Sequence, residues 1–324
     1  MEKIWKTKEL FEPSQELINV AGSKLLAQLL LQRGVNTVQK IKDFLNPLQM
    51  KITSPFVFVD MQKSVDRIFS AIENKEKIII YGDFDADGVT STSLLYKTLK
   101  CLDANVDFYI PNRETENHGL NSKALVKLIA KHRAKLIITV DCGISDVEQV
   151  SFANSFKVDV IITDHHEAPD TLPEAYAILN PKAFNSLDKD LAIEEIESLN
   201  QLAGVGVAFK LACALLEKTQ NYDFVDELLP LVAVGTIADV VPILNENRSF
   251  VQAGLKLIEQ KKHYGIAKLL EIGGYSCQNG VTSENIAFGV APRINAAGRL
   301  DTVDCAVKLL ISDNSQKLIL LLRS

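Results

Sequence analysis

The sequence predicts an α/β fold, a parallel sheet with helices on both faces, and three observations lead to this class. Short apolar runs rich in β-branched residues recur at 77–81, 105–110, 135–140, 158–162 and 176–179. Segments with helical apolar spacing lie between or after these runs, near 89–102, 121–133, 145–155 and 204–220. Repeated strand, helix, strand units at this spacing require right-handed crossovers, which place helices over the two faces of the sheet.

The segments on either side of this repeat have a helical pattern. Residues 14–45 carry apolar side chains at helical spacing, interrupted at Gly34 and closed by Pro47, which predicts a helical N-terminal segment. From residue 204 onward the apolar periodicity is again mostly helical. Residues 185–200 are acidic and poor in strong apolar anchors, so we expect an exposed connection there. The apolar run at 318–324 has no capping signal, so we expect the chain to stop inside a longer architecture.

Composition and charge narrow the classes of function. The 324-residue chain is 47% apolar, and its net charge of −6 argues against holding nucleic acid by bulk positive potential. Its five cysteines never form a Cys-x-x-Cys pair, which favours reduced thiols. The N-terminus lacks an apolar signal core, and no apolar run approaches the roughly 20 residues of a membrane span. We therefore expect a soluble, cytoplasmic protein without membrane association.

Three carboxylates alternate directly after the first predicted strand, at Asp83, Asp85 and Asp87. Close carboxylates repel one another unless a cation lies among them, so this turn predicts a divalent metal site. A calcium-binding EF-hand loop opens in the same way, but Leu94 stands where that loop needs a bidentate Glu. The nucleophile loop of haloacid-dehalogenase-type phosphatases is also similar, but the later motifs of that family do not stand out here. A solvated acidic turn is the remaining structural interpretation.

Three further segments carry candidate ligands. Asp141 and the run Asp164-His165-His166 each follow an apolar, strand-like segment, and Asp239 lies in an apolar, helix-like segment. One of the adjacent imidazoles can bind metal while the other contacts substrate or is held by its neighbour. Structural alternatives exist, because Asp141 can cap the next helix and paired histidines are often incidental. Asp239 is more telling, since a metal would remove the cost of a carboxylate in apolar surroundings.

Ligands of parallel sheets gather at the carboxyl ends of the strands, so these sequence-distant groups are expected to meet at one edge. The predicted metal ligands are five carboxylates and one imidazole: Asp83, Asp85, Asp87, Asp141, His165 and Asp239. This ligand set suits Mn²⁺ or Mg²⁺, and the imidazole favours Mn²⁺. Six ligands exceed the needs of one ion, so we expect two ions roughly 3.5–4 Å apart, a centre suited to in-line displacement at phosphorus.

Six segments match a known family as a set. They are Gly82-Asp-Phe-Asp-Ala-Asp-Gly-Val-Thr-Ser91, Val140-Asp-Cys-Gly143, Thr163-Asp-His-His166, Leu202-Ala-Gly-Val-Gly206, Gly235-Thr-Ile-Ala-Asp-Val-Val-Pro242 and Ala291-Pro-Arg-Ile-Asn-Ala-Ala-Gly-Arg-Leu300. The set resembles the DHH phosphoesterases and, within them, the RecJ type, the single-strand-specific 5′-to-3′ DNA exonucleases. The resemblance covers most of residues 50–314.

The resemblance implies how the six ligands divide between two manganese ions: Asp85 with Asp83 nearby at one ion, Asp87 with His165 and Asp239 at the other, and Asp141 as a bridge. It implies that His166 faces the scissile phosphate and that substrate phosphates are held by Arg293, Asn295 and Arg299. Surface or helix-cap charges are the structural alternative for the two arginines.

The resemblance also implies a biological context and a domain division. The reaction would release 5′-mononucleotides from single-stranded DNA in repair and recombination, with a single-strand-binding protein and a helicase as partners. The chain would comprise a helical N-terminal segment (1–50), a DHH catalytic domain (51–245) and a helical connector (246–324) leading to a second domain absent after 324. One departure is the loop Glu116-Asn117-His118-Gly119, where the family pattern is Glu-Gly-Tyr-Gly, so the role of this loop stays open.

Two other functions stay open at this point. The first is a DHH hydrolase of short oligonucleotides or nucleotide phosphates, although the segment 293–300 favours the RecJ type. The second is a non-catalytic nucleic-acid-binding relative, since some relatives keep the fold after losing metal ligands. All the expected ligand types are present here, which favours an enzyme.

Overall fold

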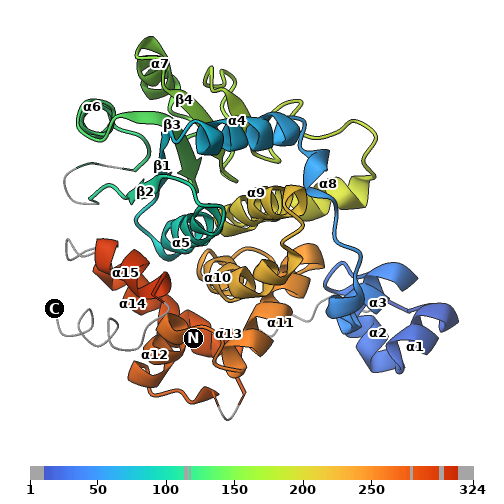
Figure 1. Ribbon diagram of the computed structural model, residues 1–324. Coiled ribbons are helices and arrows are strands. Elements are labelled where there is room, and N and C mark those ends of the chain that lie inside the picture. The colour runs from blue at the N-terminus through green and yellow to red at the C-terminus, as the bar shows by residue number, and fades with distance from the viewer. Residues whose placement is uncertain (1–10, 113–115, 117, 278–279, 299–302, 313–324) are drawn as a thin grey trace, which may run out of the picture.

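A computed structural model describes residues 11–112, 116, 118–277, 280–298 and 303–312. At its centre lies a five-stranded sheet in the order β2-β1-β3-β4-β5, with every neighbouring pair parallel (Figure 1). The strands are β1 (Lys77–Gly82), β2 (Val106–Tyr109), β3 (Ala134–Val140), β4 (Asp159–Thr163) and β5 (Ala177–Leu179). The predicted α/β class is confirmed, and the strand boundaries agree with the prediction to within one residue.

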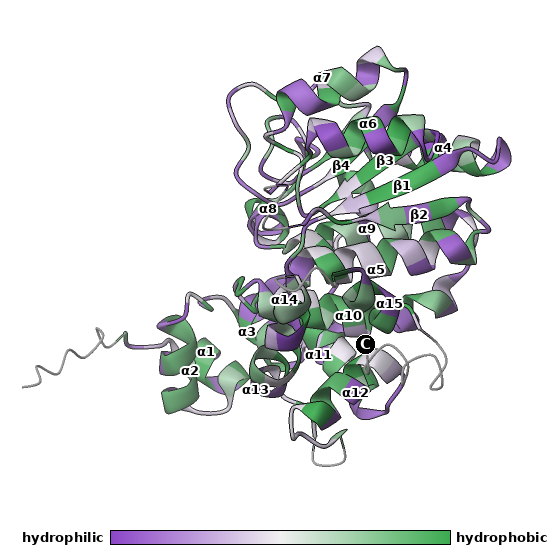
Figure 2. Cartoon of the chain, turned by 90° about the vertical axis from the view of Figure 1, so that its left-hand side faces the viewer, coloured by the Kyte–Doolittle hydropathy of each residue, from purple (hydrophilic) through white to green (hydrophobic). Residues whose placement is uncertain are grey.

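Burial on both faces explains why the strands are nearly continuous apolar runs. In β1, Ile78 and Ile80 face one core, whereas Ile79 and Tyr81 face the other. Successive side chains of a strand point to opposite faces, so a sheet covered on both sides needs apolar residues at every position. Figure 2 shows the resulting hydrophobic strands between the helical layers.

Helices cover the two faces, as predicted. One face carries α6 (Ser122–Ala130) and α7 (Val147–Ser155). The other face carries α4 (Met61–Glu73), α5 (Ala86–Cys101) and α9 (Gly204–Lys218). Figures 1 and 2 show α6 and α7 above the sheet and α5 and α9 below it.

Further helices pack beyond α5 and α9. They are α8 (Ile193–Asn200), α10 (Val225–Ala238), α11 (Asn245–Glu259), α12 (Tyr264–Ile272), α13 (Ser283–Asn285), the π-helical turn Ile286–Val290, α14 (Ala291–Ala297) and α15 (Val303–Leu310). Short 3₁₀ turns lie at Pro47–Gln49, Pro55–Val57 and Tyr222–Phe224. Among the described residues, no single helix has the length and apolar character to cross a membrane; α8 and α9 reach that composition only together, across a bend of 114°.

The N-terminal helices have a small core of their own. They are α1 (Gln15–Ala21), α2 (Lys24–Leu31) and α3 (Val38–Leu45), and each begins after a Ser or Thr whose hydroxyl accepts a backbone N–H. Their buried residues form a cluster separate from the two cores at the sheet, made of Ala21, Ala27, Leu30, Val35 and Ile41. In Figure 1 these helices stand apart from the sheet, so the predicted helical N-terminal segment is confirmed as a set of helices.

Two helices differ from the sequence analysis. Residues 185–200 were expected to be an exposed connection, but 193–200 form α8. This helix is stabilised because Leu199 is fully buried and Glu195 accepts the N–H of Ala192 at 3.1 Å, two features that its acidic composition hid. Helix α4 was not predicted, although its buried face, Met61, Val65 and Ile68, has helical spacing.

A buried ion pair joins the segment before the sheet to two helices. Lys210 in α9 lies 2.6 Å from Glu246 in α11, with side chains 2% and 0% exposed. The Lys210 ammonium also donates to the carbonyl of Thr53 at 2.7 Å, and Glu246 accepts the Thr53 N–H at 2.7 Å. Each charge therefore has both a counter-charge and a backbone partner, as buried charges require.

Replacing Lys210 with Met should cost about 3–5 kcal/mol of unfolding free energy, because Glu246 would remain buried without its counter-charge. The double variant Lys210→Met/Glu246→Leu should lose clearly less than the sum of the two single variants. Urea unfolding of the wild type and the three variants measures these differences. Additive losses would contradict the coupling of the two charges.

Candidate metal centre

The loop between β1 and α5 holds the first acidic residues. Asp85 is the N-cap of α5, and its carboxylate accepts the N–H groups of Asp87 at 2.9 Å and Gly88 at 3.0 Å. The helix therefore begins at Ala86, three residues earlier than predicted, because this cap satisfies its first donors. Burial, and then the charge of Asp83, raises the pKa of Asp85.

Asp87 lies buried in the first turn of α5, facing the N-terminus of α9. Its carboxylate oxygens accept the N–H groups of Gly204 at 2.7 Å and Val205 at 2.9 Å. Helix α9 has no side-chain cap of its own, so Asp87 supplies the negative charge that a helix N-terminus favours. Burial, followed by the charge of Asp239, raises the pKa of Asp87. The two hydrogen bonds offset part of the cost of burial and fix the orientation of the carboxylate.

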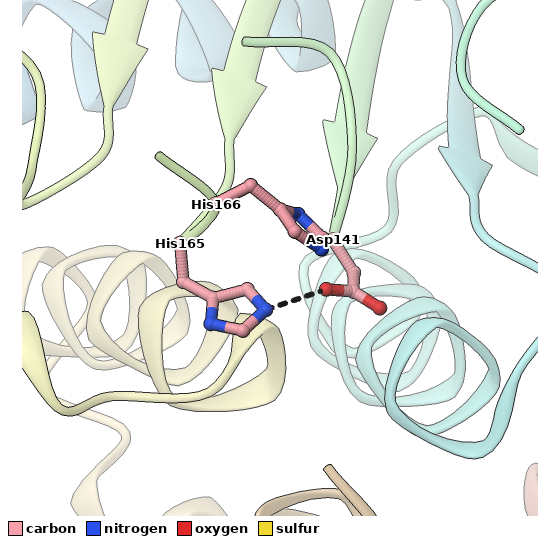
Figure 3. A group of neighbouring side chains, drawn as sticks. All are labelled: Asp141, His165 and His166. Atoms are coloured by element: carbon pink, nitrogen blue, oxygen red, sulfur yellow. Dashed lines mark ion pairs between the residues drawn. The ribbon is translucent and has the colours of Figure 1, made fainter. Parts of the chain in front are cut away.

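Asp141, His165 and Asp239 converge beside Asp87. His165 Nε2 lies 3.2 Å from Asp141 Oδ1, the contact drawn in Figure 3. The same nitrogen lies 3.7 Å from Asp239 Oδ2 and 4.0 Å from Asp87 Oδ2. Asp141 follows β3, His165 follows β4 and Asp239 is the C-cap of α10. Groups far apart in the sequence therefore meet at the carboxyl edge of the sheet.

Three atoms at this meeting point are buried without a hydrogen-bond partner: Asp141 Oδ1, His165 Nε2 and Asp239 Oδ2. An unpaired buried polar atom costs about 1–3 kcal/mol. Burial lowers the pKa of His165 to about 4, so its ring is neutral at pH 7. Burial raises the pKa of Asp239 to about 6. Carboxylate oxygens and an imidazole nitrogen that meet without hydrogen-bond partners fit a cation, because divalent metals accept this combination of ligands.

Among the described residues, three groups of side chains bring potential ligand atoms within 4.8 Å of one another: Asp83 with Asp85 and Asp141, Asp87 with His165 and Asp239, and Asp141 with His165 and His166. Asp141 belongs to two of these groups, and together the groups contain all six predicted ligands. These proximities are the spatial condition for two ions that share Asp141. The assignment of ligands to individual ions stays a prediction.

Asp164 organises the loop after β4, although it was not among the predicted site residues. One of its oxygens accepts the N–H groups of His165 at 2.7 Å and His166 at 3.2 Å, and it also lies 2.7 Å from His166 Nδ1. Its other oxygen accepts the N–H of Ile144 at 3.0 Å. The side-chain hydrogen bond with Asp164 raises the pKa of His166, whose half-exposed ring keeps Nε2 for another partner. The signal in the sequence was its position directly before the paired histidines.

His118 is a second residue that the sequence analysis left without a role. Its Nδ1 lies 3.0 Å from Asp83 Oδ1, and its ring centroid lies 5.7 Å from that of His166. The hydrogen bond with Asp83 raises the pKa of His118. Nearby, Glu116 accepts the hydroxyl of Tyr109 at 2.7 Å. The loop that departs from the family pattern therefore contacts the acidic cluster, and the departure itself was the available signal.

Two of the residues predicted to bind substrate phosphates, Arg293 and Asn295, lie in α14. Asn295 accepts the N–H of Ala86 at 2.8 Å, which fastens α14 to the start of α5. Arg293 donates to the carbonyl of Gly289 at 2.7 Å. Arg299 lies outside the described residues. The contacts of these side chains with substrate stay predictions.

Two glycines allow helices to approach the acidic residues closely. A Cβ on Gly204 would lie 2.5 Å from Asp141 Oδ1. A Cβ on Gly235 would lie 2.7 Å from Asp87 Oδ1 and 2.3 Å from Thr90 Oγ1. Because these separations are shorter than real carbon contacts, any larger residue would push α9 or α10 away from the site.

The sheet, its helices and this cluster define a class of protein. The profile of the DHH family, N-terminal domain, matches residues 77–236, which run from β1 into α10. This span contains the complete sheet and every predicted metal ligand except Asp239. The chain belongs to the DHH family.

Within this family the chain is similar to RecJ, which confirms the subfamily resemblance. It is 43% identical over 312 residues to the single-stranded-DNA-specific exonuclease RecJ of Bacillus subtilis, covering 95% of this chain and 38% of that relative. A crystal structure of exonuclease RecJ bound to manganese matches with a TM-score of 0.73 and 32% identity, over 84% of this chain and 66% of that one. The structure of RecJ from Thermus thermophilus in complex with Mn²⁺ matches with a TM-score of 0.75 and 29% identity, over 95% of this chain and 42% of that one. The chain thus spans less than half the length of the Bacillus relative.

Gly204→Ala should lower the thermal stability, although Ala normally stabilises a helix by about 0.5–1 kcal/mol relative to Gly. The reason is the 2.5 Å approach of the new Cβ to Asp141. Gly206→Ala on the same helix is the matched control, since its nearest neighbour is the end of a flexible side chain, Leu202 Cδ2, at 3.1 Å. Thermal unfolding of both variants measures the difference, and equal melting temperatures would contradict the close-approach argument.

Proposed function

We propose that this chain is the catalytic part of a metal-dependent 5′-to-3′ single-stranded-DNA exonuclease that releases 5′-mononucleotides. The observation that carries the proposal is the convergence of Asp87, Asp141, His165 and Asp239, three of which present buried atoms without hydrogen-bond partners. The similarity to RecJ, whose name states its single-stranded DNA substrate, supports the substrate class. Because the chain spans only part of that relative, the activity of a whole RecJ is itself part of the proposal.

The proposed cofactor is a pair of Mn²⁺ ions, with Mg²⁺ as the second candidate. The six ligands divide as the family resemblance implies: Asp83 and Asp85 at one ion, Asp87, His165 and Asp239 at the other, and Asp141 shared. The ligand distances within each group support this division. Hard carboxylate oxygens with one imidazole suit Mn²⁺, and the solved RecJ structures hold Mn²⁺ or Mg²⁺.

The chain's own residues prepare the site for hydrolysis of a phosphodiester. When bound, two divalent cations supply Lewis-acid stabilisation of phosphate charge and lower the pKa of water. Asp87 keeps its orientation through the N–H groups at the start of α9. The Nδ1 of His166 is held by Asp164, and the raised pKa of this ring favours the protonated form, in which Nε2–H donates to a phosphate oxygen.

Substrate holding and cellular context extend this proposal. Arg293, Asn295 and Arg299 hold substrate phosphates near the connector, which agrees with a net charge of −6 that provides no bulk attraction for DNA. The RecJ similarity supports a place in DNA repair and recombination in the cytoplasm, with a single-strand-binding protein and a helicase as partners. The division into residues 1–50, 51–245 and 246–324 is supported at its first boundary by the separate core of α1–α3.

A second candidate is a DHH hydrolase of short oligonucleotides. The specific observation in its favour is the net charge of −6, which provides no bulk attraction for a long polyanion. A long single strand needs an extended groove with basic and aromatic side chains, whereas a dinucleotide needs only the site itself. The two candidates share the metal centre and differ in the length of substrate.

Substrate length and strandedness separate the candidates. The purified chain is incubated with 5′-labelled single-stranded DNA, with duplex DNA and with dinucleotides, in Mn²⁺ or in EDTA. An exonuclease releases labelled mononucleotide from the single strand and leaves the duplex intact, and EDTA abolishes the reaction. Cleavage of dinucleotides alone would favour the short-substrate hydrolase. Tight binding of DNA without any product would favour a non-catalytic module.

Asp141→Ala and Asp239→Ala should each lower Mn²⁺-dependent hydrolysis by at least ~100-fold while keeping the fold, because each removes a predicted ligand and also relieves repulsion between carboxylates. Turnover rates and circular dichroism of both variants check this expectation. Glu148→Ala, an exposed acidic residue of α7, is the matched control and should keep wild-type turnover. Wild-type turnover in either aspartate variant would refute its role as a ligand.

Mn²⁺ affinity should fall as the pH is lowered from about 7.5 to about 5.5. Burial raises the pKa of Asp239 to about 6, so below pH 6 this carboxyl carries a proton that a cation must displace. His165, with a pKa of about 4, stays neutral over this range. Calorimetric titration near pH 6 in two buffers of different ionisation enthalpy should give different binding heats. The difference is proportional to the number of protons that are released when Mn²⁺ binds. Equal affinity at the two ends of this pH range would speak against Asp239 as a ligand.

A further inference from the structure

His118 covers the buried Asp83 from the solvent side. Its Nδ1 lies 3.0 Å from Asp83 Oδ1, and the imidazole is 53% exposed whereas the carboxylate is only 5% exposed. The ring also meets the rings of Phe84 and His166 edge-on, with centroids 6.3 Å and 5.7 Å away. The imidazole therefore has a defined position between the acidic loop after β1 and the histidine pair after β4.

The backbone next to His118 is fixed by neighbouring groups. Gly119 has φ of +82°, which favours glycine, and a Cβ there would lie 2.8 Å from the carboxylate of Asp146. The carbonyl of Gly119 accepts the hydroxyl of Tyr81 at 3.0 Å, and the N–H of Leu120 donates to Asp146 at 2.8 Å. Strand β1 and the loop after β3 thus hold His118 against Asp83.

The carboxylate of Asp83 determines which atom of this contact carries the hydrogen. A carboxylate accepts hydrogen bonds and does not donate them, so Nδ1 carries the hydrogen and donates it to Asp83. The neutral ring is sufficient for this bond. The hydrogen bond from His118 occupies only some of the lone pairs of Asp83. The others remain available to a cation held with Asp85 and Asp141, whose ligand atoms lie within 4.8 Å of that of Asp83.

We propose that His118 is a positioning residue that holds the Asp83 carboxylate in place as a ligand of a divalent cation, an inference that rests on the proposed function. The charges of Asp85 and Asp141 repel the Asp83 carboxylate. The hydrogen bond from His118, anchored at Gly119, holds the carboxylate against this repulsion. A hydrogen-bond partner of a metal ligand typically changes metal affinity by about 10–100-fold.

His118→Asn and His118→Leu separate the hydrogen bond from the ring. The amide of Asn places an N–H near the position of Nδ1, whereas Leu fills a similar volume without a donor. Calorimetric titration of the full chain with Mn²⁺, without DNA, should give about 10–100-fold weaker binding for His118→Leu and an affinity within about 3-fold of wild type for His118→Asn. His132→Leu, a histidine between α6 and β3, is the matched control and should bind Mn²⁺ like the wild type.

The Asp83→Ala background, which removes both the ligand atom and the acceptor of the His118 hydrogen bond, tests whether His118 acts through Asp83. There, His118→Leu should weaken Mn²⁺ binding by no more than about a further 2-fold, since two residues that act through one contact are not additive. A full additional loss would overturn the proposal. Wild-type affinity in His118→Leu, or equal weakening by the Asn and Leu variants, would overturn it as well.

A replacement variant and a comparison with Asp141→Ala cover the cases in which His118→Leu does not fold or the wild type does not bind Mn²⁺ at this site. Should His118→Leu fail to fold by circular dichroism, His118→Gln replaces it, because the Gln amide reaches the position of Nε2 instead of Nδ1 and should bind more weakly than His118→Asn. Failure of the proposed function itself gives a different result, since wild type would then bind Mn²⁺ no better than Asp141→Ala does.

Discussion

Asp83, Asp87 and Asp141 are buried at one edge of the sheet, close enough for their charges to oppose one another. Burial raises the pKa of Asp87 and Asp141. The charges of Asp239 and Asp85 add to this effect at Asp87, and the charges of Asp87, Asp85 and Asp83 add to it at Asp141. Backbone N–H groups of α9 compensate Asp87, but Asp141 Oδ1 has no such partner. A divalent cation among these carboxylates would offset the remaining cost, because it places positive charge next to each of them.

The topology of the sheet is what brings these charges together. Strands β1, β3 and β4 are consecutive neighbours, so the loops at their carboxyl ends lie side by side, and each carries predicted ligands. Helices α9 and α10 contribute the other side of the site. Helix α9 directs its first N–H groups at Asp87, and α10 ends at Asp239. Gly204 and Gly235 permit this approach, so packing and metal chemistry depend on the same few atoms.

Periodicity and position after a strand were the two features of the sequence that carried structural information. Apolar runs located all five strands, and the rule that ligands gather at strand ends located the acidic cluster. Residues whose role depends on tertiary contacts escaped this reasoning. Asp164 acts through hydrogen bonds to four groups around it, and His118 reaches Asp83 across 35 positions of sequence. Helix α8 was missed because the acidic composition of this segment indicated exposure. Its fully buried apolar residue, Leu199, gave too small a signal in the sequence to oppose that interpretation.

The central claim is that the crowded carboxylates surround a pair of cations. Crystals grown with Mn²⁺ and measured at its absorption edge test this most directly, because anomalous peaks locate manganese independently of any assumed ligand. We expect two peaks roughly 3.5–4 Å apart, one among Asp87, His165 and Asp239, the other beside Asp85, with Asp141 between them. An absence of peaks at this edge of the sheet, or manganese bound only elsewhere on the chain, would contradict it.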